Sequence, residues 1–121
     1  MTRILYVDDE ADIREVAQMS LELEPDFEVQ TCASGAAAIG HAAAWQPDLV
    51  LLDVMMPGMD GPTVFSRLRE QPETATIPVV FITARTQAAE VRGFLDLGAR
   101  GVLAKPFDPM TLSVRVRELL G

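Results

Sequence analysis

The chain has 121 residues, 49% of them hydrophobic and 23% charged, and this balance predicts one globular domain over residues 1–121. Its 18 acidic and 10 basic residues give a net charge of −8, which argues against direct binding to nucleic acid or to an anionic membrane. The single cysteine, Cys32, and the single histidine, His41, exclude an internal disulfide, a cysteine-rich zinc site and a multi-histidine site. The sequence shows no signal-peptide or membrane-spanning pattern, so we expect a cytoplasmic location.

In the first half of the chain, short apolar runs alternate with segments of helical periodicity. Residues 4–7 form the first run, and a helix is predicted over residues 11–23. The inward face of this helix is predicted to carry Ile13, Val16, Ala17, Ser20 and Leu21. Residues 27–32 alternate apolar and polar side chains, which predicts a half-exposed strand at the edge of a sheet. Ser34 is placed to cap the alanine-rich helix that follows, and His41 on that helix is expected to be exposed.

The second half repeats this alternation. Three apolar runs predict three more strands, at residues 49–52, 79–82 and 102–104. Each strand is followed by a predicted helix, with Pro62 in the first turn of one and Pro109 at the start of the last. The helix between these two covers about residues 87–97, ends at Gly98 and is expected to place Leu95 in the core.

Regular alternation of strands and helices predicts an α/β fold, a doubly wound five-stranded parallel sheet with five helices on its two faces. Right-handed crossovers and an edge position for the strand at residues 27–32 favour the strand order 2-1-3-4-5. In such a sheet, side chains that follow neighbouring strands meet at the edge formed by the carboxyl ends.

Four of the apolar runs end at residues with charge-handling or reactive side chains, which are Asp8 with Asp9, Asp53, Thr83 and Lys105. Taken singly, each has an ordinary alternative, such as a helix cap, a solvated charge or a strand-end hydroxyl. Their occurrence together at four strand ends instead predicts one pocket that holds three carboxylates, a hydroxyl group and an ammonium group.

Four segments of the chain match a known pattern in order and spacing: VDDE at 7–10, LLDVMMPGMDG at 51–61, ITA at 82–84 and KPF at 105–107. Over essentially its full length, the chain resembles the receiver domain of two-component response regulators. The same strand order is implied by this resemblance. The resemblance also implies that Asp53 is the phosphoacceptor, which receives a phosphoryl group from a histidine kinase or a phosphotransfer protein.

The resemblance further implies a Mg²⁺ site formed by Asp8, Asp9, Asp53 and the backbone carbonyl of Met55. Asp9 would bind the ion directly and Asp8 partly through water. Mg²⁺ suits this set because it is a small, hard ion that prefers oxygen ligands and neutralises phosphoryl charge.

Two further residues are assigned to the phosphoryl group by the resemblance. The hydroxyl group of Thr83 would donate a hydrogen bond to one phosphoryl oxygen, and the ammonium group of Lys105 would pair with another. A cis peptide bond between Lys105 and Pro106 would aim the lysine inward.

The chain departs from the family pattern at Val102, where family members often carry an aromatic residue that moves together with the threonine. A β-branched side chain cannot make the same swing, so coupling is expected to run through Thr83 and the helix at residues 87–97. Met55 and Arg85 flank the acceptor and are expected to tune hydrolysis of the aspartyl phosphate, with Arg85 as a possible shield against water.

The leading interpretation is a phosphorylation-dependent signalling module that assists its own phosphorylation and dephosphorylation and turns over no separate substrate. Its output would be a changed surface around the helix at residues 87–97, the last strand and the last helix, read by a downstream domain or protein. The domain would act as a monomer or as a phosphorylation-dependent dimer.

Two alternatives stay open from the residues alone. A degenerate receiver would act as a constitutive protein-binding module, which the intact acidic, hydroxyl and ammonium positions argue against and Val102 leaves possible. A haloacid-dehalogenase-type phosphatase would need a second aspartate two residues after the nucleophile, where this chain has Met55.

Overall fold

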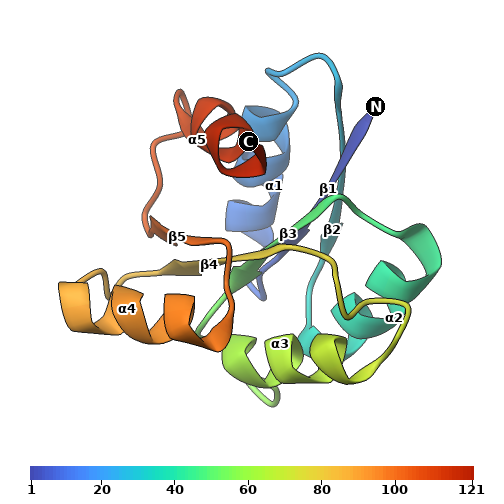
Figure 1. Cartoon of the computed structure of the whole chain (residues 1–121). Coiled ribbons are helices and arrows are strands. Elements are labelled where there is room, and N and C mark those ends of the chain that lie inside the picture. The colour runs from blue at the N-terminus through green and yellow to red at the C-terminus, as the bar shows by residue number, and fades with distance from the viewer.

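The computed structural model describes all 121 residues and contains a five-stranded parallel sheet. The strands are β1 (Thr2–Val7), β2 (Phe27–Cys32), β3 (Leu49–Asp53), β4 (Val79–Thr83) and β5 (Gly101–Ala104). Their order across the sheet is β2-β1-β3-β4-β5, and every neighbouring pair is parallel (Figure 1). The predicted fold class and strand order are confirmed.

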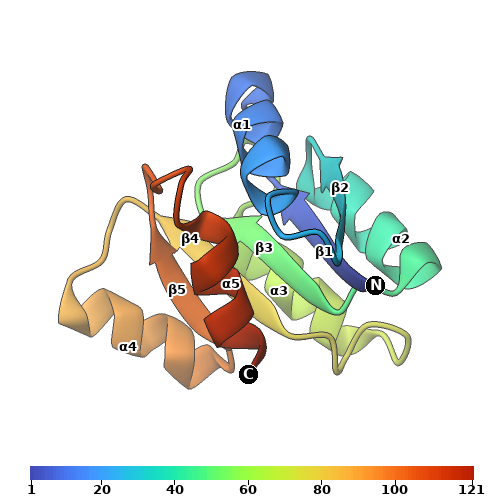
Figure 2. The same cartoon turned by 90° about the horizontal axis from the view of Figure 1, so that it is seen from above.

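Five helices cover the two faces of the sheet. They are α1 (Ala11–Leu21), α2 (Gly35–Trp45), α3 (Gly61–Glu70), α4 (Ala88–Leu97) and α5 (Leu112–Leu120). Helices α1 and α5 lie on one face, and α2, α3 and α4 lie on the other (Figures 1 and 2). None of these helices combines the length and the apolar character needed to cross a bilayer.

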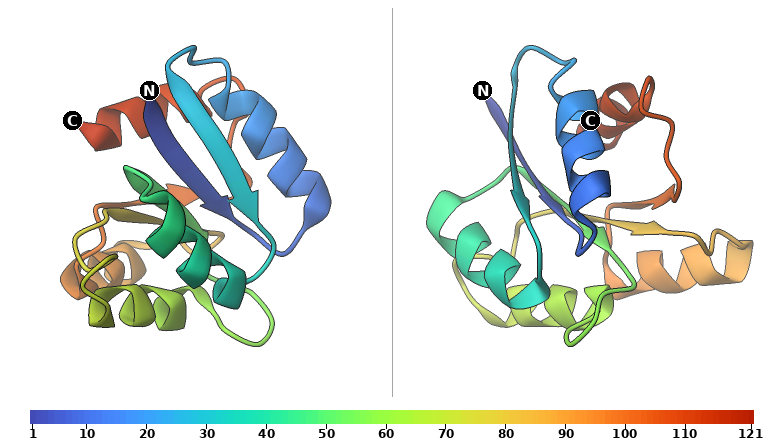
Figure 3. Two further views of the ribbon diagram at one scale, coloured as in Figure 1. Left: turned by 90° about the vertical axis from the view of Figure 1, so that its right-hand side faces the viewer. Right: turned by 180° about the vertical axis from the view of Figure 1, so that it is seen from behind.

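The core consists of two apolar clusters, one on each face of the sheet. The cluster under α2 and α3 contains 15 buried residues and the cluster under α1 and α5 contains 13. All residues of β3 and β4 are buried. Strand β2 lies at the edge of the sheet (Figure 3) and mixes buried with more exposed positions. Continuous apolar runs therefore mark strands covered on both faces, as the sequence predicts.

Several residues at the ends of helices and strands have the structural roles that the sequence predicts for them. The Ser34 hydroxyl accepts a hydrogen bond from the backbone N–H of Ala37 at 3.2 Å and caps α2. Pro62 lies in the first turn of α3. Gly98 ends α4 with a φ of 111°, a left-handed conformation that glycine adopts without strain. The Lys105–Pro106 peptide bond is cis, as expected.

Four expectations about individual side chains and boundaries are wrong. Val16 and Leu95 are each 42% exposed, because α1 and α4 bury a narrower stripe than their apolar residues suggest. His41 is half-buried and hydrogen-bonded to the side chain of Gln30 on the neighbouring strand. Helix α5 begins at Leu112, because Pro109 belongs to the preceding turn.

Candidate functional site

The ammonium group of Lys105 lies at the centre of the predicted pocket. Its Nζ is 3.1 Å from Asp8 Oδ2, 3.1 Å from Asp53 Oδ2 and 3.5 Å from Glu10 Oε1. Asp53 is the last residue of β3, and the other three residues follow β1 or β5; the carboxyl ends of these strands lie along one edge of the sheet. The structure therefore brings Lys105 together with Asp8 and Asp53, as the sequence predicts.

Asp8 is completely buried, and both of its carboxylate oxygens accept hydrogen bonds. Oδ1 accepts from the backbone N–H of Glu10 at 3.0 Å, and Oδ2 accepts from the Tyr6 hydroxyl at 3.1 Å as well as from Lys105. Burial and the nearby Asp8 charge raise the pKa of Tyr6, so the phenol keeps its proton. Asp9, by contrast, is exposed.

Asp53 is 2% exposed and ends β3, which runs through the middle of the sheet. Its Oδ1 accepts a hydrogen bond from the backbone N–H of Met55 at 3.4 Å. Burial raises the pKa of Asp53 above its usual value, although the hydrogen bond from Lys105 acts in the opposite direction. Burial alone would lower the pKa of Lys105, but its hydrogen bonds to Asp53 and Asp8 raise it.

A glycine determines how closely the loop between β3 and α3 returns to Asp53. The backbone N–H of Gly61 donates to the Val54 carbonyl at 2.9 Å. A Cβ atom at this position would lie 2.6 Å from the Asp53 carbonyl oxygen, so only glycine fits without a backbone shift. The loop also contains Gly58, with a φ of 78°.

Thr83 ends β4 beside Asp53 and is 3% exposed. Its Oγ1 accepts a hydrogen bond from the backbone N–H of Arg85 at 3.0 Å, which leaves the hydroxyl proton free to be donated elsewhere. Thr83 and Arg85 line an open groove of about 580 Å³ that runs between the loop after Asp53 and α4. The side chain of Arg85 is exposed.

Val102 on β5 is half-buried and lies beside Phe81 on β4 in the parallel register. The Phe81 ring contacts the ring of Phe94 on α4, with centroids 4.8 Å apart. Phe94 is the α4 side chain that packs against a core cluster, and it also lines the groove beside Thr83. The contact between Phe81 on β4 and Phe94 on α4 thus lies next to Val102, the β5 position where family members often carry an aromatic residue.

Residues 4–117 match the family model of the response regulator receiver domain. The chain belongs to this family. It is thus a receiver domain of two-component response regulators, which implies a role in phosphorylation-dependent signalling.

Named relatives and solved structures agree with this assignment. The chain is 42% identical over 121 residues to the DNA-binding dual master transcriptional regulator RpaA of Synechocystis sp., a match covering 99% of this chain and 49% of that protein. It is 46% identical over 119 residues to the response regulator PleD of Caulobacter vibrioides, covering 97% of this chain and 26% of that protein. The chain therefore spans about half or less of the length of these curated relatives.

Solved receiver structures have the same fold. The chemotaxis response regulator CheY4 of Vibrio cholerae is similar with a TM-score of 0.89 and 31% identity, and the match covers 98% of each chain. A response regulator from Desulfuromonas acetoxidans is similar with a TM-score of 0.87 and 31% identity, covering 99% of this chain and 97% of that one.

Receiver domains generally bind Mg²⁺ in an acidic pocket, and the donor set of this receiver domain fits that ion. Carboxylate oxygens of Asp8, Asp9 and Glu10 lie within 4.8 Å of one another. The Met55 carbonyl accepts no backbone hydrogen bond, so its lone pairs are available. Carboxylate and carbonyl oxygens are the ligands that Mg²⁺ prefers.

Two residues of this pocket were not singled out by the sequence pattern. Glu10 is the third acid of the VDDE segment, and its pairing with Lys105 depends on how the chain turns into α1. Tyr6 lies two positions before Asp8, so the alternation of a strand places both on one face of the sheet. Its spacing from Asp8 and its being the only tyrosine of the chain are the sequence features that could have indicated that Tyr6 belongs to the pocket.

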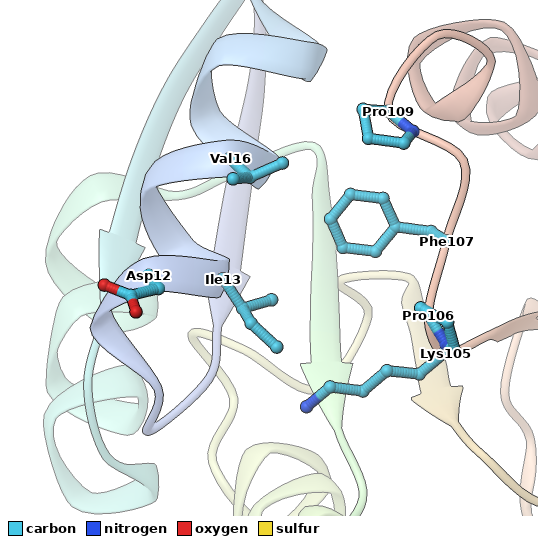
Figure 4. Close-up of a pocket in the computed structure, with 7 residues that line it drawn as sticks. All are labelled: Asp12, Ile13, Val16, Lys105, Pro106, Phe107 and Pro109. Atoms are coloured by element: carbon cyan, nitrogen blue, oxygen red, sulfur yellow. The ribbon is translucent and has the colours of Figure 1, made fainter.

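An apolar pocket of about 210 Å³ lies beside the acidic site, between α1 and the loop that follows β5. Figure 4 shows Phe107 directed toward Val16 and Ile13, with Lys105 extending from the same loop. The pocket therefore exposes apolar surface close to Lys105, the residue that contacts Asp53.

Proposed function

We propose that Asp53 accepts a phosphoryl group from the phosphohistidine of a histidine kinase or a histidine phosphotransfer protein, in a Mg²⁺-dependent reaction. The observation that carries the proposal is the position of Asp53, which is buried beside an acidic cluster with its Oδ2 3.1 Å from Lys105 Nζ. The apolar pocket between α1 and the β5–α5 loop supplies surface on which a donor protein can bury side chains near this carboxylate.

In the transfer step, a carboxylate oxygen of Asp53 forms a bond to phosphorus while the bond between phosphorus and the donor imidazole nitrogen breaks. The imidazole leaves with the electron pair of that bond and gains a proton from solvent. Lys105 can then turn from the carboxylates to a phosphoryl oxygen, and Thr83 can donate its free hydroxyl proton to another. The loose transition state carries charge on these oxygens, so alignment and charge neutralisation supply most of the catalysis.

Asp8, Asp9, Asp53 and the Met55 carbonyl would hold the Mg²⁺ ion, and Glu10 lies close enough to the first two to join them. The bound ion would neutralise phosphoryl charge that the carboxylates otherwise repel. The protein fixes one of these ligands in advance, because Asp8 is held by three hydrogen bonds.

Hydrolysis of the aspartyl phosphate would be controlled by the residues that cover it. Met55 and Arg85 both line the groove next to Thr83, and both side chains are exposed. Arg85 carries a guanidinium group that can lean over the phosphoryl oxygens and restrict the approach of water.

The signal would leave the site through the surface of α4, β5 and α5. Because Val102 cannot swing as an aromatic ring does, the contact between Phe81 and Phe94 is the available route from β4 to α4. No α4 residue is buried, so this helix is held by few core contacts and can shift at low cost. A downstream domain or protein would read the changed surface, on a monomer or on a phosphorylation-dependent dimer.

Incubation with acetyl phosphate, followed by intact-mass spectrometry, tests the proposal. Wild-type protein should gain the mass of one phosphoryl group with Mg²⁺ and remain unmodified with excess EDTA, and Asp53→Asn should remain unmodified in both. Wild-type protein that stays unmodified with Mg²⁺ would favour a degenerate receiver that acts only as a binding module.

A further inference from the structure

Tyr6 places a buried phenol directly beneath the acidic cluster. It is the only tyrosine of the chain, it is fully buried, and its hydroxyl donates to Asp8 Oδ2 at 3.1 Å. Its ring meets the ring of Phe107 edge-on, with centroids 6.3 Å apart. A phenylalanine would fill the same space, so packing alone does not account for the hydroxyl group.

Asp8 Oδ2 has two side-chain donors, and only one of them is free to leave. Lys105 Nζ and the Tyr6 hydroxyl each lie 3.1 Å from this oxygen. In the proposed reaction Lys105 turns to a phosphoryl oxygen, and Asp8 Oδ2 then loses that donor. A buried carboxylate oxygen without a donor is costly, and Tyr6, fixed on β1, stays in place to satisfy it.

We propose that Tyr6 is a positioning residue that fixes the Asp8 carboxylate for Mg²⁺ binding, with and without Lys105 beside it. Metal-binding carboxylates depend on such hydrogen-bond partners for their orientation. The inference rests on the proposed function of the site, because it takes Asp8 as a Mg²⁺ ligand. It adds a residue that acts through Asp8 without touching the reacting atoms.

Tyr6→Phe tests this proposal, because it removes one oxygen and keeps the ring. We expect calorimetry to show Mg²⁺ binding to the variant that is about tenfold weaker than to wild type.

The matched control is Thr74→Val, which removes a buried hydroxyl group that donates to the Leu68 carbonyl at 2.6 Å. Thr74 precedes β4 and so lies toward the opposite edge of the sheet. Its loss should lower the urea midpoint and leave Mg²⁺ affinity unchanged.

Phosphorylation kinetics separate positioning from a general loss of structure. In Tyr6→Phe, the Mg²⁺ concentration that gives half of the maximal phosphorylation rate should rise about tenfold, and the maximal rate should stay close to wild type. A Tyr6→Phe protein that binds Mg²⁺ as tightly as wild type would overturn the inference. If calorimetry shows weaker Mg²⁺ binding to Tyr6→Phe than to wild type, but wild-type protein gains no phosphoryl mass, the proposed function is rejected and the inference about Tyr6 stands.

A second measurement applies even if Tyr6→Phe does not fold. Wild-type protein labelled with ¹³C at the ζ carbon of tyrosine gives one signal, because Tyr6 is the only tyrosine. This signal should shift on addition of Mg²⁺ and saturate with the affinity found by calorimetry. A signal that saturating Mg²⁺ does not move would contradict a hydrogen bond to a metal-binding carboxylate.

Discussion

At the scale of single residues, the site concentrates negative charge around the only lysine of the chain. Lys105 contacts Asp8, Glu10 and Asp53, and Asp9 lies in the same acidic cluster. Four carboxylates around one ammonium group leave a net negative charge without metal. Such an arrangement should lower the stability of the metal-free protein, and it is the arrangement that the proposed Mg²⁺ site requires.

Asp53→Asn should therefore raise the free energy of unfolding in excess EDTA by about 1 kcal/mol, because an amide replaces a buried charge that is repelled by Asp8. Asp9→Asn is the control and should change it less, because Asp9 is exposed. Urea denaturation at neutral pH measures both. An unchanged or lower urea midpoint for Asp53→Asn would contradict the electrostatic account.

Arg85→Ala should shorten the lifetime of the phosphorylated protein several-fold, because it removes the guanidinium group that we propose covers the phosphoryl oxygens. The decay of phosphorylated protein, followed by intact mass after removal of the donor, measures this lifetime. Arg92→Ala is a matched control on the exposed side of α4 and should leave the decay unchanged. Equal decay of Arg85→Ala and wild type would reject the shielding role.

At the scale of elements, the loop between β3 and α3 depends on glycine at one position. In Gly61→Ala, the new Cβ would clash with the Asp53 carbonyl at 2.6 Å and the Val54 Cα at 2.9 Å. The variant should lose about 1–3 kcal/mol of stability, since backbone atoms must shift. In Gly40→Ala on α2 no atom lies within 4 Å of the new Cβ, and stability should rise by about 0.5–1 kcal/mol. Urea midpoints that change in the same direction for both would contradict this interpretation.

A second element-scale contact joins α5 to the loop between α1 and β2. Arg117 pairs with Asp26 and with Glu24, and its guanidinium group lies 4.8 Å from the centroid of the Phe27 ring. Desolvation by itself raises the pKa of Asp26, but the hydrogen bond and charge of Arg117 hold it below its usual value. This stabilisation is present above the unfolded-state pKa of Asp26 and is lost as pH falls through the lowered folded-state value.

Arg117→Met should accordingly move the pKa of Asp26 up toward its usual value and lower the urea midpoint at pH 7. The stability difference from wild type should shrink in acid, where Asp26 is protonated in the folded and unfolded states of both proteins. NMR titration of the Asp26 carboxyl carbon measures the pKa. A titration curve that is identical in the variant and wild type would show that the pairing does not form in solution.

The sequence predicted the elements well, because their signals are local or periodic. Buried strands β3 and β4 are continuous apolar runs in the sequence. Ser34 marks a helix start through its side-chain hydroxyl, and Gly98 marks a helix end through its backbone conformation. Which side chains of a helix are buried was less predictable, because this depends on which face of the helix packs against the sheet. Leu95 is exposed because α4 reaches the core through Phe94.

At the scale of the whole molecule, the parallel sheet is what turns distant residues into one site. Asp8, Asp53, Thr83 and Lys105 were predictable as neighbours, because each ends a strand or directly follows one and the strand order follows from the pattern. Contacts of Tyr6 and Glu10 were not predictable, since they depend on side-chain positions within the assembled pocket. Helices α2, α3 and α4 cover one face of this sheet, and α1 and α5 cover the other (Figure 2).

Locating the phosphoryl group tests the central claim most directly. Protein phosphorylated with acetyl phosphate and Mg²⁺ can be treated with borohydride, which reduces an aspartyl phosphate to homoserine, and then sequenced by tandem mass spectrometry. We predict homoserine at position 53 and unmodified aspartate at positions 8 and 9. Homoserine at position 8 or 9, or at no position, would contradict Asp53 as the phosphoacceptor.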